Sequence, residues 1–366
     1  MHIGLTILGS LEYGSGGFQY DRIIVERLRQ MGEQVTVVSL PWRSYTRSLA
    51  DNLGDEVARR HQPLDFDVLI QDHLAHPALL RFNYRLRRSG RFPLVSLVHL
   101  LRWNSQDWPA PQRLFYRQVE RLYFGSLDGV IGVSRYNLGL VAKLLGRELP
   151  SVAAYPGGDH LQAEISEAEI RRRAIHSGPL HVVFTGMVIR RKGLHLLLEA
   201  LAGLPALDWQ LSVVGSLEHE PAYARRLQRM VQKKGLAGQV RWLGRLSQAE
   251  IGDIYRQAHV FAMPSLAEGY AVVYLEAMGC GLPPLATAAS GAGELLRHGE
   301  NGCLVRPGDV SALQAHLIEL AQDRCKLAEM GCAARQAYLA HPTWEQAAEG
   351  IRTFLYQVAA QGIRHV

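Results

Sequence analysis

Short apolar runs alternate with helical patterns along this chain, and the alternation occurs as two successive series. Each series predicts five strands: residues 3–8, 34–40, 68–70, 94–99 and 129–133, then residues 181–186, 211–215, 240–243, 260–264 and 284–287. Such alternation is typical of parallel sheets whose strands are joined by crossover helices. The sequence therefore predicts an α/β fold with two parallel sheets.

The two series meet near a proline- and glycine-rich segment. A last apolar run of the first series, residues 152–155, leads into Pro156-Gly-Gly-Asp159, which should interrupt regular structure. A length of 366 residues suffices for two α/β domains, each with its own core. Capping-box pairs predict three helix starts: Ser247 with Glu250, Ser311 with Gln314, and Thr343 with Gln346. The last helix carries an apolar stripe, so we expect it to pack against another element.

The cysteines and the apolar segments favour a cytoplasmic protein. All four cysteines lie in the C-terminal part without a C-x-x-C pair, which favours free thiols in a reducing compartment: Cys280, Cys303, Cys325 and Cys332. No apolar run approaches the roughly 18 residues that a membrane-spanning helix needs. Residues 1–8 lack a basic segment and are typical of a strand, so we expect no signal peptide.

A basic segment lies between residues 81 and 91, with five arginines and no acidic residue in a chain of net charge +6. On a helix, Arg81, Arg85 and Arg88 would line one face. Two interpretations stay open: a solvated surface helix, or an amphipathic face that rests on anionic lipid at the inner side of a membrane. Nucleic acid is not an expected partner, because no known reading motif accompanies the charge.

Glu268 and Glu276 form the strongest candidate site. We expect Glu268 on a glycine-containing turn and Glu276 two turns into the helix that follows. If the whole stretch is helical, it rises about 12 Å between them. Two carboxylates that share one anomeric carbon lie only about 5–5.5 Å or 6.5–9.5 Å apart. The pair should therefore hold two ends of an elongated ligand, with a phosphate on free N–H groups at the helix start. A sugar joined to a nucleoside through a diphosphate has this shape.

A basic turn follows the first strand of the second series. Lys192 lies in this turn, between Gly186 and Gly193, just before a helix whose positive end would add to its charge. On its own the turn would be a solvated basic loop. Beside the two glutamates, we interpret Lys192 as a ligand of the diphosphate.

Two further candidates follow strands of the first series. Gly16 and Gly17 end the turn that begins at Gly14, at a position where doubly wound sheets bind ligands. The turn lacks the full G-x-G-x-x-G pattern, so an empty tight turn is the alternative. His99 ends the strand expected at residues 94–99, and a half-buried structural histidine is the alternative there.

Several landmarks together resemble family 4 of the retaining glycosyltransferases. They cover most of the chain: Gly16-Gly17, residues 130–134 and 155–157, Gly186 with Lys192-Gly193, Val214-Gly215, residues 261–265, Glu268 with Glu276, residues 281–283, Gly291 with Glu294, Asn301-Gly302 and Pro307-Gly-Asp309. The resemblance implies the GT-B architecture, in which two Rossmann-like doubly wound domains face each other across a cleft. It implies an N-terminal acceptor domain over residues 1–158 and a nucleotide-sugar donor domain over residues 178–342, with residues 343–366 crossing back to the first.

The resemblance also implies a reaction. A hexose would move from a nucleotide-diphosphate sugar to a glycan, glycolipid or small molecule with retention of its anomeric configuration, as in polysaccharide or glycolipid biosynthesis. Glu268 and His99 would contact the donor sugar, and Lys192 the diphosphate. The remaining implied donor contacts are Gly16, Gly17, Gly269, Tyr270 and Ala271 at the diphosphate, and Glu276 at the ribose. The departing phosphate would help to deprotonate the acceptor, so no carboxylate nucleophile, metal or cofactor is expected.

One departure from the family pattern concerns the diphosphate site. The family often has arginine directly after the glycine of this turn, where this chain has Met187. Either Arg190 or Arg191 substitutes for it, or the diphosphate is held more loosely. Other functions therefore stay open: a sugar-nucleotide-binding protein of weak activity, a phosphorylase or epimerase on the same scaffold, or a lipid-surface adaptor. The sequence leaves the donor base, the sugar and the acceptor undecided.

Overall fold

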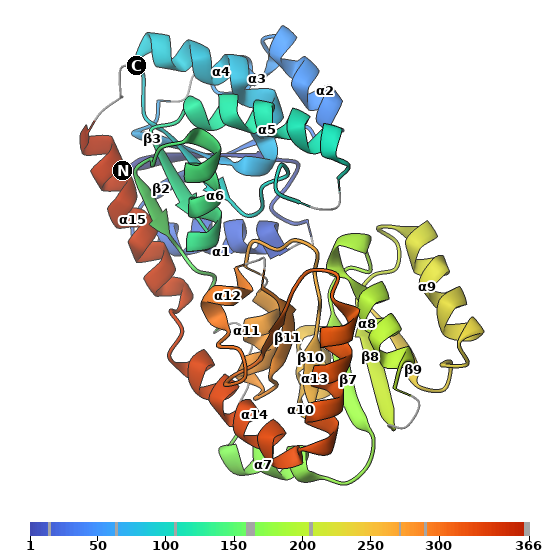
Figure 1. The fold of residues 1–366 in the computed structure, drawn as a ribbon. Helices are drawn as coiled ribbons and strands as arrows, with labels where there is room; N and C mark the ends of the chain where they lie inside the picture. The colour runs from blue at the N-terminus through green and yellow to red at the C-terminus, as the bar shows by residue number, and fades with distance from the viewer. Residues whose placement is uncertain are drawn as a thin grey trace. The chain divides into compact units, whose positions relative to one another are not determined.

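The computed structural model describes residues 1–13, 16–62, 65–105, 108–158, 165–204, 208–270, 272–288 and 291–361. The chain forms two compact units, whose elements Figure 1 labels. The first unit is Met1–Gly157 with Pro342–Val366, and the second is Gly158–His341.

The first unit is a parallel sheet flanked by helices. Its strands are β1 (His2–Leu8), β2 (Gln34–Leu40), β3 (Val68–Asp72), β4 (Leu94–Val98), β5 (Gly129–Gly132) and β6 (Ser151–Ala153). Its helices are α1 (Gly16–Gln30), α2 (Tyr45–Ala50), η1 (Asp51–Leu53), α3 (Glu56–Arg60), η2 (His73–Ala75), α4 (His76–Ser89), α5 (Ala110–Gly125), α6 (Arg135–Leu145) and α15 (Trp344–Gln361). The strand order is β2-β1-β3-β4-β5-β6. Every residue of β3, β4 and β5 is buried, as expected for strands covered on both faces.

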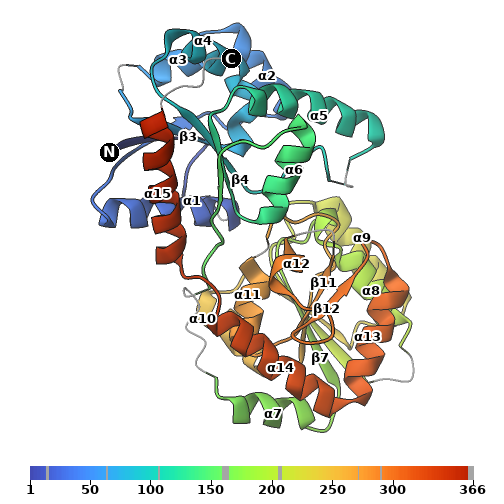
Figure 2. The same cartoon turned by 60° about the vertical axis from the view of Figure 1, so that its left-hand side comes forward.

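The second unit repeats this architecture with a different strand order. Its strands are β7 (Leu180–Thr185), β8 (Trp209–Val214), β9 (Val240–Gly244), β10 (Val260–Ala262), β11 (Pro284–Thr287) and β12 (Cys303–Val305). Its helices are α7 (Glu167–Ile175), η3 (Arg190–Lys192), α8 (Leu194–Ala202), α9 (Pro221–Lys233), α10 (Gln248–Gln257), α11 (Val272–Gly279), α12 (Ala292–Leu295), α13 (Val310–Gln322) and α14 (Arg324–Leu339). The strand order is β12-β11-β10-β7-β8-β9. Figure 2 shows α7 beside α14.

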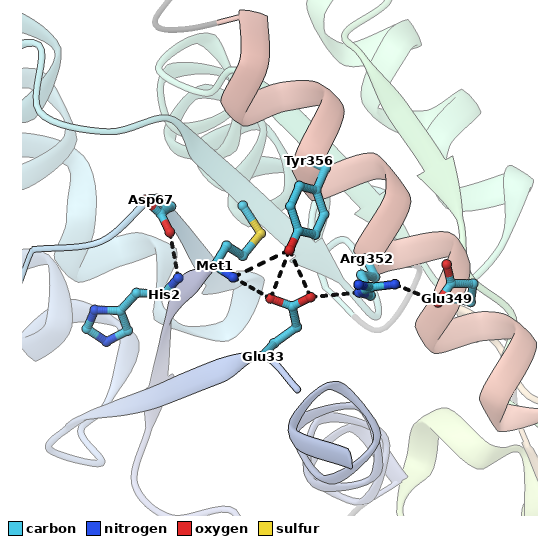
Figure 3. Close-up of polar contacts among 7 residues, drawn as sticks. All are labelled: Met1, His2, Glu33, Asp67, Glu349, Arg352 and Tyr356. Carbon is cyan, nitrogen blue, oxygen red and sulfur yellow. Dashed lines mark hydrogen bonds and ion pairs between the residues drawn. The ribbon is translucent and has the colours of Figure 1, made fainter. Parts of the chain in front are cut away.

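The C-terminal helix α15 belongs to the first unit, where it lies beside α1. Its apolar stripe is buried, as predicted. An ionic anchor adds to this packing: the carboxylate of Glu33 accepts from the Met1 amino group and from Arg352 Nε, each at 2.6 Å, and from the Tyr356 hydroxyl at 3.1 Å (Figure 3). Burial raises the pKa of Glu33, but these donors lower it by more than burial raises it, so the net pKa lies below its ordinary value.

The predicted strands are all present, with ends shifted by a few residues. Two predicted capping boxes are confirmed, Ser247 with Glu250 and Thr343 with Gln346. The third was wrong, because α13 begins before Ser311 and Asp309 is its cap, accepting from the Ala312 N–H at 2.9 Å. Strand β12 was not predicted, because a run of three residues gives no usable pattern.

All four cysteines are free thiols, as predicted. Within the described ranges, no helix is both long enough and apolar enough to span a bilayer.

Candidate functional site

The strand orders locate one point in each sheet where a ligand can reach the carboxyl ends of the strands. In open α/β sheets, ligands bind where consecutive connections leave in opposite directions, because a crevice opens between them. In the second unit this switch point lies between β7 and β10, and in the first unit it lies between β1 and β3. The predicted site residues follow these strands or their neighbours.

The loops that follow β7 and β10 are pressed together. The Leu266 N–H donates to the Arg191 carbonyl at 2.8 Å. Gly193 has a φ of 72°, and any Cβ there would clash with the carbonyl oxygen of Pro264. Only glycine combines this backbone conformation with this close approach. The contact brings Lys192, at the end of η3, next to Glu268.

Glu268 forms the centre of a buried ionic cluster. Its Oε1 lies 2.6 Å from Arg191 Nη1 and 2.6 Å from Lys192 Nζ. The three side chains are only 9%, 20% and 11% exposed, respectively. Burial raises the pKa of Glu268, but the charges of Arg191 and Lys192 lower it more, so the carboxyl is ionised. Burial lowers the pKa of Lys192, and Glu268 compensates for this only in part.

Arg191 is a site residue that the sequence left undecided. Its Nη1 contacts both Glu268 and the Ala267 carbonyl oxygen, the latter at 2.7 Å. The side chain of Arg190 is exposed, and its backbone N–H donates to Glu220 at 3.0 Å. Arg191 therefore supplies the second cation beside Lys192. With one carboxylate between two cations, the cluster carries a net positive charge and suits an anionic ligand.

Glu276 lies on α11, whose start differs from the prediction. The helix begins at Val272, so Glu276 is just over one turn into it, and residues 264–270 are not helical. The expected position two turns into a helix was therefore wrong, and the estimate of about 12 Å for a continuous helix does not apply. Glu276 is 5% exposed, and its charge adds to burial in raising the pKa of Tyr255 on α10.

The segment between the two glutamates is partly described. Gly269 and Tyr270 lie shortly before α11, and Tyr270 is buried with its ring stacked on His341 at 5.8 Å between centroids. Ala271 lies outside the described residues. Gly269 and Tyr270 therefore lie before the helix and not in its first turn.

The first unit brings another group of predicted residues together. Gly16 and Gly17 are the first residues of α1, while Gly14 lies outside the described residues. His99 follows β4 directly and does not end the strand as predicted. A Cβ on Gly17 would lie 3.5 Å from the His99 ring, whereas one on Gly16 would meet nothing within 4 Å. Gly17 and His99 are therefore neighbours, and Gly16 faces open space.

Two buried acids beside His99 were not predicted. His99 Nε2 lies 2.8 Å from Oδ1 of Asp21 on α1, and Asp72, the last residue of β3, belongs to the same cluster. A signal for Asp21 was present in the sequence, since it is a charged residue on the otherwise apolar face of α1. Nothing in the local sequence connects Asp72 to His99, because their contact depends on strand order.

Another buried cluster fixes the loop that leaves His99. Oxygens of Glu120 on α5 accept from the backbone N–H groups of Arg102 at 2.9 Å and Trp103 at 3.2 Å. His73 Nε2 lies 3.3 Å from Glu120 Oε1, and the His73 ring stacks on His76. Burial raises the pKa of Glu120 to about 7. Because both of its oxygens serve the backbone, we assign this cluster a structural role.

Comparison with known proteins identifies the family. Residues 166–337 match the profile described as Glycosyl transferases group 1. D-inositol 3-phosphate glycosyltransferase of Arthrobacter sp. (strain FB24) is 31% identical over 296 residues, which cover 76% of this chain and 68% of that protein. The chain belongs to the glycosyl transferases group 1 family. The resemblance inferred from the motifs is thereby confirmed, and Lys192, Glu268 and Glu276 all lie within the matched segment.

Other similarities extend over the full length of this glycosyltransferase. Phosphatidyl-myo-inositol mannosyltransferase of Mycobacterium leprae (strain TN) is 27% identical over 392 aligned residues, covering 100% of this chain and 96% of that protein. The solved structure of Anabaena HepE in complex with UDP and glucose matches with a TM-score of 0.75 at 23% identity, over 97% of this chain and 99% of that one. That likeness shows the fold: both units are Rossmann-like, as in the GT-B class.

Proposed function

We propose that this glycosyltransferase transfers a hexose from a nucleotide-diphosphate sugar with retention of anomeric configuration, and that it needs no metal. The observation that carries the proposal is the pairing of Glu268 with Lys192 and Arg191 at the switch point of the second sheet. Two cations around one carboxylate provide a positive site for a diphosphate next to an acceptor for sugar hydroxyls.

Each predicted contact has a place in this proposal. Lys192 binds the diphosphate, and Arg191 supports it in place of the arginine that Met187 replaces. The backbone at Gly269, Tyr270 and Ala271, with that at Gly16 and Gly17, completes the phosphate contacts. Glu276 holds the ribose, while Glu268 and His99 hold the sugar. The bound UDP and glucose in HepE support a donor of this class.

The state of Glu268 favours a positioning role over a nucleophilic one. Its ionised Oε1 contacts two cations at 2.6 Å each, which lowers the electron density available for attack on an anomeric carbon. Lys192 and Arg191 can instead neutralise the leaving diphosphate, which is the task a metal performs in other transferases. The departing phosphate oxygen then accepts the proton of the acceptor hydroxyl on the same face of the sugar.

The reaction class can be tested directly. Thermal-shift measurements with UDP, GDP and ADP should show stabilisation by one nucleotide, because binding to the folded state raises the apparent stability. Incubation with the matching sugar donor should release nucleoside diphosphate, also in the presence of EDTA, and NMR of the product should show the donor's anomeric configuration. Release of sugar phosphate would instead favour a phosphorylase. Nucleotide binding without turnover on any acceptor would favour a binding protein.

We also propose peripheral contact of the first unit with an anionic membrane, since a named relative acts on phosphatidyl-myo-inositol. Two of the predicted arginines pair with Asp55: its Oδ1 lies 3.7 Å from Arg81 Nη2 and 2.6 Å from Arg85 Nη1. The third, Arg88, lies over the Tyr84 ring. The pairing with Asp55 reduces the positive charge that α4 presents to a lipid surface, whereas Arg88 keeps its charge beside the neutral ring.

Helix α5 supports the membrane proposal better. It exposes three large apolar side chains among exposed arginines, and its acid Glu120 is buried: the exposed set is Leu114, Phe115 and Leu122 with Arg117 and Arg121. Apolar and basic side chains on one helical face are typical of helices that lie in a lipid interface.

A vesicle assay with a matched control tests the α5 face. Leu114→Ser combined with Leu122→Ser should weaken sedimentation with phosphatidylglycerol vesicles about tenfold or more, because a buried leucine contributes about 1.5–3 kcal/mol. Leu339→Ser removes an equally exposed leucine from α14 of the second unit, 66% against 68% for Leu122, and should have no effect. Equal binding by all three proteins would remove α5 from the proposal.

A further inference from the structure

The buried cluster around His99 combines three titratable side chains from three segments of the first unit. One atom each of Asp21, Asp72 and His99 lies within 4.8 Å of the others. Both aspartates are 1% exposed, whereas the His99 side chain remains 17% exposed. Only the histidine can therefore reach a ligand, and the two acids must act through it.

The hydrogen bonds of this cluster do not satisfy two ionised aspartates. Asp21 Oδ1 bonds to His99 Nε2, and Asp72 Oδ1 accepts from the Leu74 N–H at 3.0 Å. The second oxygens, Asp21 Oδ2 and Asp72 Oδ2, are buried and have no hydrogen-bond partner among the described residues. Two adjacent buried carboxylates cannot both ionise at low cost beside a single histidine. A proton on one of them removes the repulsion and turns one orphaned acceptor into a donor.

The identity of the protonated acid follows from the partners. Asp21 contacts the histidine, which stabilises its charge, whereas Asp72 accepts from a single backbone N–H within the part of the chain that the structure describes. We propose that Asp21 and Asp72 form an unequal pair that positions His99: ionised Asp21 holds the ring as a cation through Nε2, and Asp72 keeps its proton.

The pKa directions agree with this assignment. Burial and the charge of Asp21 raise the pKa of Asp72 to about 7. Burial lowers the pKa of His99, whereas the charge and hydrogen bond of Asp21, and to a lesser degree the charge of Asp72 in its ionised form, raise it; the net pKa lies above its ordinary value. The other titratable groups nearby are Tyr20 on α1, His73 on η2 and Tyr123 on α5, and burial favours the neutral form of each.

The pair would fix both the orientation and the charge of His99. With Nε2 committed to Asp21, Nδ1 is the nitrogen left for a ligand. The ring is also bounded by Gly17 and by the edge of Tyr20 at 5.2 Å between centroids. Resting on the proposed function, in which His99 contacts the donor sugar, the cationic ring donates from Nδ1 to a sugar hydroxyl. Asp21 and Asp72 are then positioning residues for the transfer.

Isosteric variants separate the two acids. Asp72→Asn keeps the oxygen that accepts from Leu74 and supplies N–H donors where Asp72 would carry its proton, so it should reproduce the native state. Asp21→Asn removes the charge that holds His99 as a cation, and Asp21→Glu restores that charge. The histidine is followed by NMR of its ring nitrogens across pH, with its signal assigned by its disappearance in His99→Gln.

We expect His99 to titrate above its ordinary value near 6.5 in the native protein and in Asp72→Asn, and below that value in Asp21→Asn. Turnover should fall about tenfold or more in Asp21→Asn, with recovery in Asp21→Glu. A lowered His99 titration in Asp72→Asn, an unchanged one in Asp21→Asn, or a divalent cation whose binding Asp72→Asn abolishes would overturn the proposal. The titration needs no substrate. If it behaves as expected while His99→Gln leaves turnover intact, the proposed role of His99 fails and the pairing stands.

Discussion

Replacing Glu268 by glutamine should destabilise the second unit strongly, because it leaves two cations without their anion. Breaking a buried ion pair by removing one partner costs about 3–5 kcal/mol. Arg191 and Lys192 keep some contact with solvent, at 20% and 11% side-chain exposure, which favours the lower end of that range. We therefore expect Glu268→Gln to lower the free energy of unfolding by about 3 kcal/mol. For a domain of the size of Gly158–His341, each kcal/mol shifts Tm by about 2–4 °C, so the expected drop is about 6–12 °C.

The matched control is Glu300→Gln. Glu300 also pairs with an arginine, Arg297 at 2.7 Å, but the two side chains are 55% and 72% exposed. Exposed pairs of this kind contribute about 0–1 kcal/mol, so Tm of this variant should stay near that of the native protein. Calorimetry or circular dichroism on both variants, without nucleotide, measures the difference.

The pH dependence of this loss has a definite sign. The folded pKa of Glu268 lies below its ordinary value, so its stabilisation is present above the unfolded pKa near 4.3 and disappears as pH falls through the folded pKa. The stability gap between native protein and Glu268→Gln should therefore be constant between about pH 6 and 8 and should close only in strong acid. If Glu268→Gln matches Glu300→Gln in Tm at pH 7, the cluster is not the ionic centre described above.

Three further predictions follow from other contacts. Glu276→Ala should weaken nucleotide affinity, whereas Glu268→Ala should mainly reduce turnover; equal loss of affinity in calorimetric titrations of both would contradict this division. Arg352→Ala should lower the free energy of unfolding measured in urea, because Glu33 loses one of its three donors. Glu33→Gln should lower it more, because the neutral amide loses the charge that attracts the Met1 amino group and Arg352 and keeps only one accepting oxygen. Asp72→Asn should be more stable than the native protein at pH 8 but not at pH 4. The folded pKa of Asp72 is raised to about 7, so the free energy of unfolding of the native protein falls by up to about 4 kcal/mol as pH rises from the unfolded pKa to that value. The asparagine variant has no such loss. A urea midpoint for Asp72→Asn that tracks the native protein at both pH values would contradict that assignment.

The strands were predictable because buried parallel strands are continuous apolar runs. Their carboxyl ends then indicated where Lys192, His99 and Glu268 lie, since each follows a strand of the pattern. Two predictions failed for local reasons. Ser311 and Gln314 satisfy a capping pattern, but Asp309 reaches the same helix start first. Strand β12 is too short to show any period.

The site was predictable only as far as single motifs extend. Three consecutive basic residues form η3. Which of their side chains turn toward Glu268 depends on the contact between Leu266 and the Arg191 carbonyl, which no local pattern encodes. The cluster of Asp21 and Asp72 with His99 was harder still. Its members come from α1, β3 and the residue after β4, and only the strand order makes them neighbours.

The two clusters differ in net charge, and this difference divides the expected contacts with a donor. Two cations and one carboxylate give the Lys192 cluster a net positive charge, which matches a diphosphate. In the proposed protonation state, the His99 cluster is neutral overall and presents one oriented donor. A neutral cluster gives little long-range attraction for phosphate, but an oriented N–H selects a hydroxyl in a fixed position. Salt should therefore weaken nucleotide binding through the Lys192 cluster, while substitutions around His99 should change turnover and sugar choice without changing that salt dependence.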